Sequence, residues 1–359
     1  MSNQTEHLIS GIQQVGIGVP DVHEAWKWYR QHLGVNIPIF EERAEANLML
    51  PYTGGKPHHR HAILAINGQG GGGLEIWQYT SRKPQPPGFE VQLGDLGINM
   101  IKYKSRNIRN SYDFLKSKGT ELMGDLTAAP SGKKHFYLKD RYGNWIELIE
   151  SKEWFHKNGD HSGGVYGVVI GVSDVERALP LYRDILGYDV VVYDEEGTFE
   201  DFSEIPGGRG RFRRMLLGHS EARKGSFSPM LGNTVIELVQ SLDRKPRKIL
   251  ENRYWGDLGY IHLCYDVRNM PALRDYCAAK GHPFTVDSSA DREVFDMGEA
   301  AGNFAYIEDP DGTLIEFVEA YKIPIVKKLG WYLNLRKRHP EKPLPRWMLR
   351  ALALNKKKD

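Results

Sequence analysis

The chain is poor in the features that mark secreted and membrane-spanning proteins. Its 359 residues include only two cysteines, Cys264 and Cys277, too few for a disulfide framework. The polar N-terminus lacks the apolar stretch of a signal peptide, and no apolar run approaches the length of a membrane span. A formal net charge of +2 argues against a nucleic-acid partner. We therefore expect a cytoplasmic protein with room for two domains.

What the chain does contain is an internal repeat. The sequence Val-Pro-Asp-Val-His-Glu-Ala at 19–25 returns as Val-Ser-Asp-Val-Glu-Arg-Ala at 172–178. Gly-Asp-Leu-Gly occurs at both 94–97 and 256–259. Matches at a nearly constant offset predict two copies of one domain.

Each copy divides again into two quarters with the order βαβββ, which predicts an α+β fold. In the first quarter, Asp21 occupies the N-cap position of a helix, Glu24 completes a capping-box pattern, and Gly34 is expected to end the helix. The predicted units are a first domain at 1–155 (quarters 11–80 and 94–152), a second domain at 156–320 (quarters 163–241 and 256–320), and a tail at 321–359.

The last strand of every quarter carries one glutamate among apolar neighbours. Burying a carboxylate in such surroundings is costly unless another group pairs with it or a metal coordinates it. Four glutamates at equivalent places therefore predict a metal-facing position that is used four times. These residues are Glu75, Glu147, Glu237 and Glu316.

Paired βαβββ quarters, a Val-x-Asp at the helix start and Asp-Pro-Asp-Gly-x-x-Ile-Glu at 309–316 resemble the vicinal oxygen chelate superfamily. The superfamily includes glyoxalase I, extradiol dioxygenases and bleomycin-resistance proteins. The resemblance covers residues 11–320 and implies open, cupped sheets around a divalent metal. It places the ligands on the first and last strands of each quarter. Carried over, these positions are Gln14 and Glu75, Met100 and Glu147, Gly167 and Glu237, and His262 and Glu316.

Two pairings of the quarters remain open. If neighbouring quarters pair, each half forms a three-ligand site. If the first quarter pairs with the fourth, one site gathers Gln14, Glu75, His262 and Glu316, the ligand set of Gln-containing glyoxalase I. We favour this swapped pairing because one complete site and one decayed site account most simply for the missing ligands.

The resemblance implies a metal-dependent isomerase, epimerase or lyase. A divalent Zn, Ni, Mn or Fe ion would bind two adjacent oxygens of a small-molecule substrate. Glu316 or Glu75 would take a proton next to the chelated carbonyl, forming an enediolate. The alternative is a non-catalytic protein that binds small molecules. An extradiol-type dioxygenase is a weaker alternative, because neither half offers two histidines and one glutamate.

Other residues bear on the substrate. Arg209, Arg211 and Arg213 alternate, so on a strand Arg211 and Arg213 would share a face and bind an anionic substrate group. A solvated edge strand is the alternative interpretation. Tyr306 is expected either to contact a substrate hydroxyl or to pack. The histidines His58, His59 and His61 match no standard metal motif and are expected at a surface.

The tail differs in composition from the rest of the chain. Residues 321–359 contain twelve Lys or Arg against two acids, and aromatic residues alternate with the basic ones. This pattern suits either peripheral contact with an anionic membrane or docking onto the acidic body, and we favour docking. The sequence makes no prediction about oligomeric state.

Overall fold

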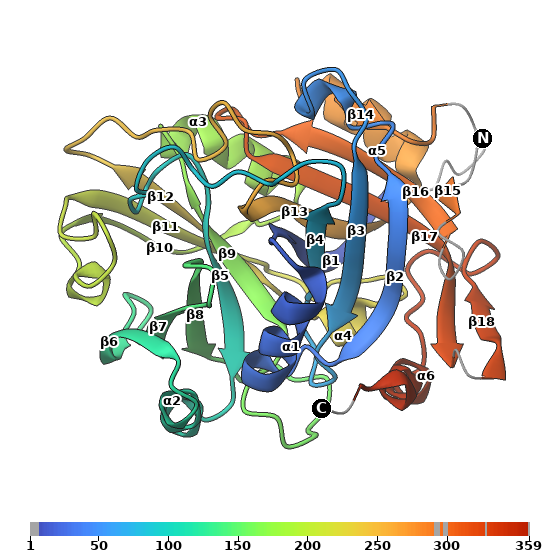
Figure 1. The fold of residues 1–359 in the computed structure, drawn as a ribbon, viewed down its shortest axis with the longest axis horizontal. Helices are drawn as coiled ribbons and strands as arrows, with labels where there is room; N and C mark the ends of the chain where they lie inside the picture. Colours follow the sequence, from blue (N-terminus) through green and yellow to red (C-terminus); the bar gives the residue numbers. More distant parts are fainter. Residues whose placement is uncertain (1–6, 291–294, 297–300, 327–328, 358–359) are drawn as a thin grey trace.

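The computed structural model describes residues 7–290, 295–296, 301–326 and 329–357. Small parts of the predicted first domain, fourth quarter and tail lie outside these ranges. Within them, the strands form two curled sheets with few helices, so the predicted α+β fold of four βαβββ modules is confirmed (Figure 1).

The 10-stranded sheet combines the first and fourth quarters of the chain. Its central pair is β1 and β13, which run antiparallel. The main order is β14 (Val286–Asp287), β16 (Ala301–Glu308), β17 (Leu314–Val326), β13 (Gly259–Arg268), β1 (Leu8–Gly18), β4 (Gly73–Tyr79), β3 (His59–Ile66) and β2 (Ile37–Glu45). The short strands β15 (Phe295–Asp296) and β18 (Trp331–Asn334) pair with β16 and β17.

The 8-stranded sheet combines the second and third quarters around the antiparallel pair β5 and β9. Its order is β10 (Val190–Gly197), β11 (Phe212–Gly218), β12 (Val235–Ser241), β9 (Val165–Gly171), β5 (Gly97–Ser105), β8 (Trp145–Glu150), β7 (Lys134–Lys139) and β6 (Glu121–Ala128). The swapped pairing of quarters is therefore confirmed, and the neighbour pairing is wrong.

The described residues include six α-helices, and the first of them begins and ends where local sequence signals place it. They are α1 (Val22–Leu33), α2 (Ile108–Ser117), α3 (Val175–Pro180), α4 (Ser228–Leu231), α5 (Met270–Ala279) and α6 (Arg346–Ala351). The Asp21 side chain accepts hydrogen bonds from the backbone N–H groups of His23 and Glu24, and Gly34 ends α1 with a φ of 64°. The capping box is only half formed, because the Glu24 carboxylate pairs with Arg141 at 2.9 Å.

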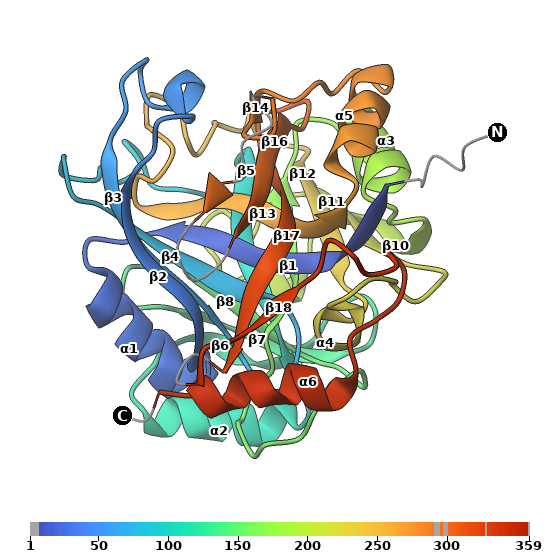
Figure 2. The ribbon, with the colours of Figure 1, turned by 90° about the vertical axis from the view of Figure 1, so that its right-hand side faces the viewer.

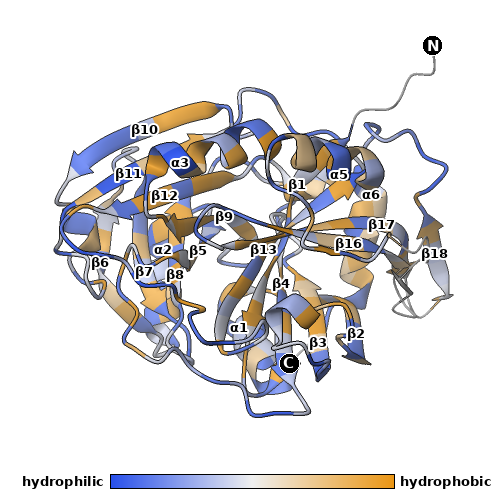
Figure 3. Ribbon diagram, turned by 90° about the horizontal axis from the view of Figure 1, so that it is seen from above, coloured by the Kyte–Doolittle hydropathy of each residue, from blue (hydrophilic) through white to orange (hydrophobic). Residues whose placement is uncertain are grey.

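Two equivalent hydrogen bonds join the sheets. Tyr29 on α1 donates to Asp140 at 2.6 Å, and Tyr182, at the corresponding place in the repeat, donates to Asp309 at 2.9 Å. Around them, apolar residues from both sheets and their helices form one large buried cluster. Figure 3 shows hydrophobic residues concentrated on the strands in the middle of the molecule. This common core holds the central strands of each sheet in place.

The C-terminal tail docks on the body of the same chain. Strand β17 continues to Val326 across the predicted boundary at residue 320, and α6 lies against β17 and α4 (Figure 2). The tail residues Leu335, Leu344 and Leu349 are buried in a cluster with side chains of the body. Peripheral membrane contact through the basic tail, in which Trp347 is exposed, remains a prediction. No helix in the described part of the chain is long and apolar enough to cross a membrane.

Leu349 should contribute strongly to this docking. Because its side chain is 2% exposed, Leu349→Ala is expected to lower the free energy of unfolding by about 2–4 kcal/mol, measured by urea denaturation. Trp347→Ala is the control in the same helix, since Trp347 is 60% exposed and its loss should change stability by about 0.5 kcal/mol or less. Equal effects would show that the tail does not depend on this packing.

Candidate metal centre

The centre of the 10-stranded sheet brings a histidine and two glutamates together. His262 on β13 lies opposite Gly16 on β1, and a Cβ at Gly16 would stand 2.5 Å from the imidazole. Glycine at this position therefore leaves room for the ring. Strands β4 and β17 flank the central pair and bring Glu75 and Glu316 to the two sides of His262.

The four residues assigned as ligands lie within reach of one another. His262 Nε2 is 3.1 Å from Glu316 Oε2 and 3.3 Å from Glu75 Oε2. The Gln14 amide nitrogen donates to Glu75 Oε2 over 3.4 Å. Gln14 is thus the glutamine that contacts Glu75, and β1 has the register that the sequence predicted.

Three buried polar atoms of this group form no hydrogen bond of good geometry among the described residues, although two of them face each other as an ion pair. They are Gln14 Oε1, His262 Nε2 and Glu316 Oε2. Buried polar atoms are normally satisfied, so such a group requires an explanation, and an ion is one. One imidazole nitrogen, one amide oxygen and two carboxylates suit a divalent cation of intermediate softness. These residues therefore fit a metal.

The surroundings orient His262 and control its charge. The Tyr306 hydroxyl lies 3.2 Å from His262 Nδ1, which leaves Nε2 directed at the glutamates, and the Trp255 ring stacks 6.2 Å away. Burial lowers the pKa of His262, but the carboxylates of Glu316 and Glu75 raise it, to about 10. Burial raises the pKa of Glu316, yet His262 brings it below its usual value. A proton on His262 thus balances the glutamates, and a bound cation would displace it.

A cavity of about 180 Å³ opens onto this group. Its walls are mainly apolar and include Phe40, Leu64 and Val318. One buried cation, Arg60, lies in the wall: its Nη2 donates to Glu42 at 2.7 Å, while Nη1 is buried without a partner in the described residues. The cavity therefore offers an apolar space between the candidate ligands and one hydrogen-bond donor.

The equivalent place in the 8-stranded sheet is occupied by a lysine. Lys102 Nζ contacts Glu147 and lies 2.6 Å from Glu237 Oε2, and all three side chains are buried. Lys102 stands opposite Gly167, where a Cβ would lie 2.1 Å from the Val235 carbonyl oxygen. No side chain can therefore stand at that ligand position. The ammonium group balances the two carboxylates where the other sheet has His262.

Other buried side chains complete this network. Arg214 pairs with Glu237 and Asp201 at 2.8 Å, and His135 Nδ1 lies 2.7 Å from Glu147. Burial raises the pKa of Glu147, but Lys102 lowers it overall. Burial likewise acts against charge on Lys102, although Glu147 and Glu237 raise its pKa above the usual value. The cupped face of the 8-stranded sheet, which we call the second cup, therefore holds a closed network of ion pairs.

The predicted substrate residues fall in different places. Tyr306 lines the cavity and contacts His262. Strand β11 begins at Phe212, so Arg209 and Arg211 precede it and the predicted row of three arginines on one strand face does not form. Arg213 is on β11 in the other sheet and pairs with Asp194 and Glu176 at 2.7 Å. Neither Arg211 nor Arg213 lines the cavity beside Glu316.

Sequence reasoning missed Lys102, Arg214 and Arg60. A partial signal for Lys102 was present, because it lies two residues after Met100 between the apolar residues Ile101 and Tyr103. Met100 itself is fully buried in an apolar cluster. Arg60 follows His58 and His59, which the sequence places at a surface. Its burial depends on packing against β2 and the cavity wall, so the neighbouring residues do not predict it.

Comparisons with known proteins agree with this architecture. The family described as the Glyoxalase/Bleomycin resistance protein/Dioxygenase superfamily matches residues 11–148 and 165–317. No curated protein matches the sequence. A putative dioxygenase from Bacillus subtilis is similar in structure, with a TM-score of 0.56 and 15% identity over 87% of this chain and 86% of that one. Glyoxalase I from Zea mays has a TM-score of 0.52 and 15% identity over 86% and 92%. At these identities the likeness shows the fold alone.

Proposed function

The chain belongs to the Glyoxalase/Bleomycin resistance protein/Dioxygenase superfamily, and we propose that it is a metal-dependent isomerase, epimerase or lyase of the glyoxalase type. The observation that carries the proposal is the convergence of buried ligand atoms on Glu75, His262 and Glu316, all within 4.8 Å of one another, beside the unsatisfied Oε1 of Gln14. In the 8-stranded sheet the ammonium group of Lys102 already stands between the equivalent glutamates, Glu147 and Glu237, so we place the reaction in the 10-stranded sheet alone.

A divalent cation held by Gln14, Glu75, His262 and Glu316 would supply Lewis acidity toward two adjacent oxygens of the substrate. Glu316 is the candidate base, because its carboxylate lines the cavity and is able to accept a proton there. Glu316 would return that proton to the neighbouring carbon, and Glu75, on the other side of His262, would act as the base in the same way for a substrate bound through its opposite face. Tyr306 keeps the imidazole oriented throughout.

The cavity supports a substrate with an apolar portion. Phe40, Leu64 and Val318 would cover it and exclude water, while the candidate ligands face its oxygens. The unpaired Nη1 of Arg60 would donate to an acceptor oxygen elsewhere on the same molecule. This arrangement suits a hydroxy-ketone or oxo-acid derivative with an apolar side chain better than a fully hydrophilic sugar.

The proposal is tested by proton exchange. Purified protein loaded in turn with Zn²⁺, Ni²⁺, Mn²⁺ or Fe²⁺ is incubated in D₂O with α-hydroxy ketones and 2-oxo compounds bearing apolar side chains, and deuterium at the carbon next to the carbonyl is followed by NMR. Exchange should be metal-dependent and should fall about 10²–10⁴-fold in Glu316→Gln. Glu45→Gln is the matched control, because Glu45 also lines the cavity but pairs with His59.

A different outcome would favour the non-catalytic alternative. Tight binding of such compounds to metal-free protein, with affinity unchanged in Glu316→Gln and no deuterium exchange with any of the four metals, would identify a binding protein. The apolar cavity would then be the functional feature, and the glutamates would be structural remnants.

A further inference from the structure

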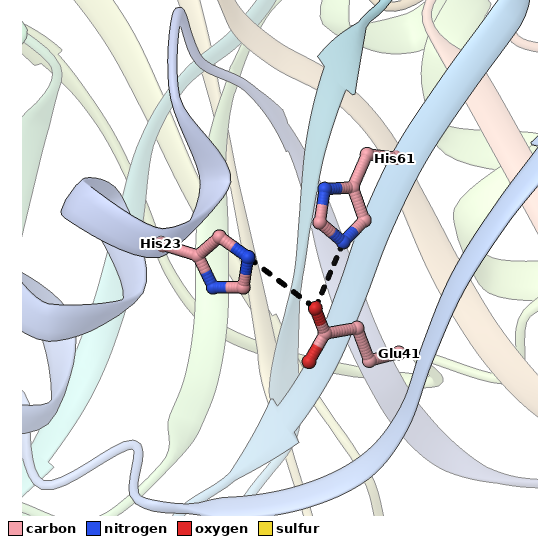
Figure 4. Close-up of side chains that lie close together, drawn as sticks. All are labelled: His23, Glu41 and His61. Carbon is pink, nitrogen blue, oxygen red and sulfur yellow. Dashed lines mark hydrogen bonds and ion pairs between the residues drawn. The ribbon is translucent and has the colours of Figure 1, made fainter.

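A second group of potential ligands lies on the outside of the 10-stranded sheet. His61 Nε2 is 2.9 Å from Glu41 Oε1, and His23 Nε2 is 3.4 Å from the same oxygen (Figure 4). One potential ligand atom from each of the three residues lies within 4.8 Å of the others. The two imidazoles thus converge on one carboxylate oxygen from two directions.

Three separate elements hold these side chains in place. His23 is in the first turn of α1, which begins at the Asp21 cap. Glu41 on β2 and His61 on β3 are two pairs apart in the antiparallel ladder, where Arg43 faces His61 and Glu41 faces Ile63. Diagonal neighbours of this kind share one face of a sheet. The group is therefore built on regular structure rather than on loops, which favours a defined geometry.

The burial pattern suits an ion that enters from solvent. The His61 side chain is only 4% exposed, whereas those of His23 and Glu41 are 55% and 43% exposed. The buried ligand would hold the ion in a fixed position, and the two accessible ligands would leave a path by which the ion enters from solvent. The pair of His59 on β3 and Glu45 on β2 differs, since its atoms lie 3.7 Å apart with no third potential ligand grouped with them in the described residues.

We propose that His23, Glu41 and His61 form a surface site for a divalent transition-metal cation such as Zn²⁺. Two imidazole nitrogens and one carboxylate oxygen are preferred zinc ligands, and three protein ligands leave a position for water. The bound ion would tie α1 to β2 and β3. Because side chains alternate along a strand, Phe40 and Arg60, the neighbours of Glu41 and His61, face the substrate cavity. The bound ion would therefore stabilise the cavity wall from the outer face of the sheet.

The test separates this site from the central one. In Glu316→Ala protein, which lacks a central ligand, isothermal titration with ZnCl₂ should still detect one Zn²⁺ per chain. Adding His23→Ala or His61→Ala should abolish that binding, and His59→Ala, the exposed histidine on the same strand, should leave it unchanged. Because His23 is largely exposed, His23→Ala should fold normally, which circular dichroism checks.

Two results would overturn the proposal. One is Zn²⁺ binding that survives both His23→Ala and His61→Ala, which would place the ion elsewhere. The other is a Glu316→Ala protein that is correctly folded and binds no Zn²⁺. Thermal melting gives an independent readout: Zn²⁺ should raise the Tm of Glu316→Ala, and the shift should vanish in the His23→Ala double variant.

Discussion

Lys102→Met is expected to lower the free energy of unfolding by about 3–5 kcal/mol, because it leaves two buried carboxylates without their shared cation. Lys102 Nζ contacts both Glu147 and Glu237, and the three side chains are at most 3% exposed. Methionine has nearly the same length, so the change removes the charge with little loss of volume. Urea denaturation followed by tryptophan fluorescence measures the effect.

Lys104→Met is the matched control two residues further along β5. Lys104 is buried as well, but among the described residues its Nζ makes one long hydrogen bond of 3.4 Å, to the Glu153 carbonyl oxygen, and lies 5.7 Å from the centre of the Trp154 ring. Burial lowers its pKa to about 8. Its replacement should therefore be nearly neutral or stabilising. If both substitutions lower the free energy of unfolding equally, the second cup is stabilised by burial of the lysine side-chain carbons and not by charge pairing.

Lys104 also predicts a pH dependence. Its folded-state pKa of about 8 lies below the usual value of 10.5, so the unfolded chain binds more protons between these values. The wild-type free energy of unfolding should consequently gain a rising contribution between pH 8 and 10.5. Comparison of Lys104→Met with wild type across this range isolates that contribution, which should be absent from the variant. A difference that does not change with pH would contradict the assignment.

The second large effect is expected at the metal centre. Protein purified without chelators should retain a divalent metal at the central site, and His262→Ala or Glu316→Ala should remove it. Loss of the same metal in Gln14→Ala and Glu75→Ala would follow from the contacts across β1, β4, β13 and β17. Elemental analysis by mass spectrometry measures the metal, with samples dialysed to release weakly held surface ions.

Glu45→Gln again supplies the control, because the exposed Glu45 pairs with His59 and makes no contact with His262. Its metal content should equal that of the wild type. Unchanged metal in folded His262→Ala would remove this residue from the ligand set and, with it, the main support for chemistry in the 10-stranded sheet.

Local patterns predicted much of the fold. Glycine at position 34 and aspartate at 21 end and begin α1 for reasons of backbone geometry and hydrogen bonding that act within a few residues. The recurrence of one glutamate among apolar neighbours predicted that Glu75 and Glu316 face a site inside the protein, and both line the cavity. The role of Lys102 was not predictable in this way, because it depends on Gly167 of another quarter lying opposite it.

The sequence by itself determined four βαβββ quarters, each with one inward glutamate, and the candidate ligands Gln14 and His262. Only the tertiary structure decided that β1 pairs with β13 and β5 with β9, and hence which glutamates meet a histidine and which meet a lysine. The physical reason is that caps, turns and side-chain alternation are set by neighbouring residues. Pairing of equivalent strands is decided instead by packing between segments about 250 residues apart in one sheet and about 70 in the other.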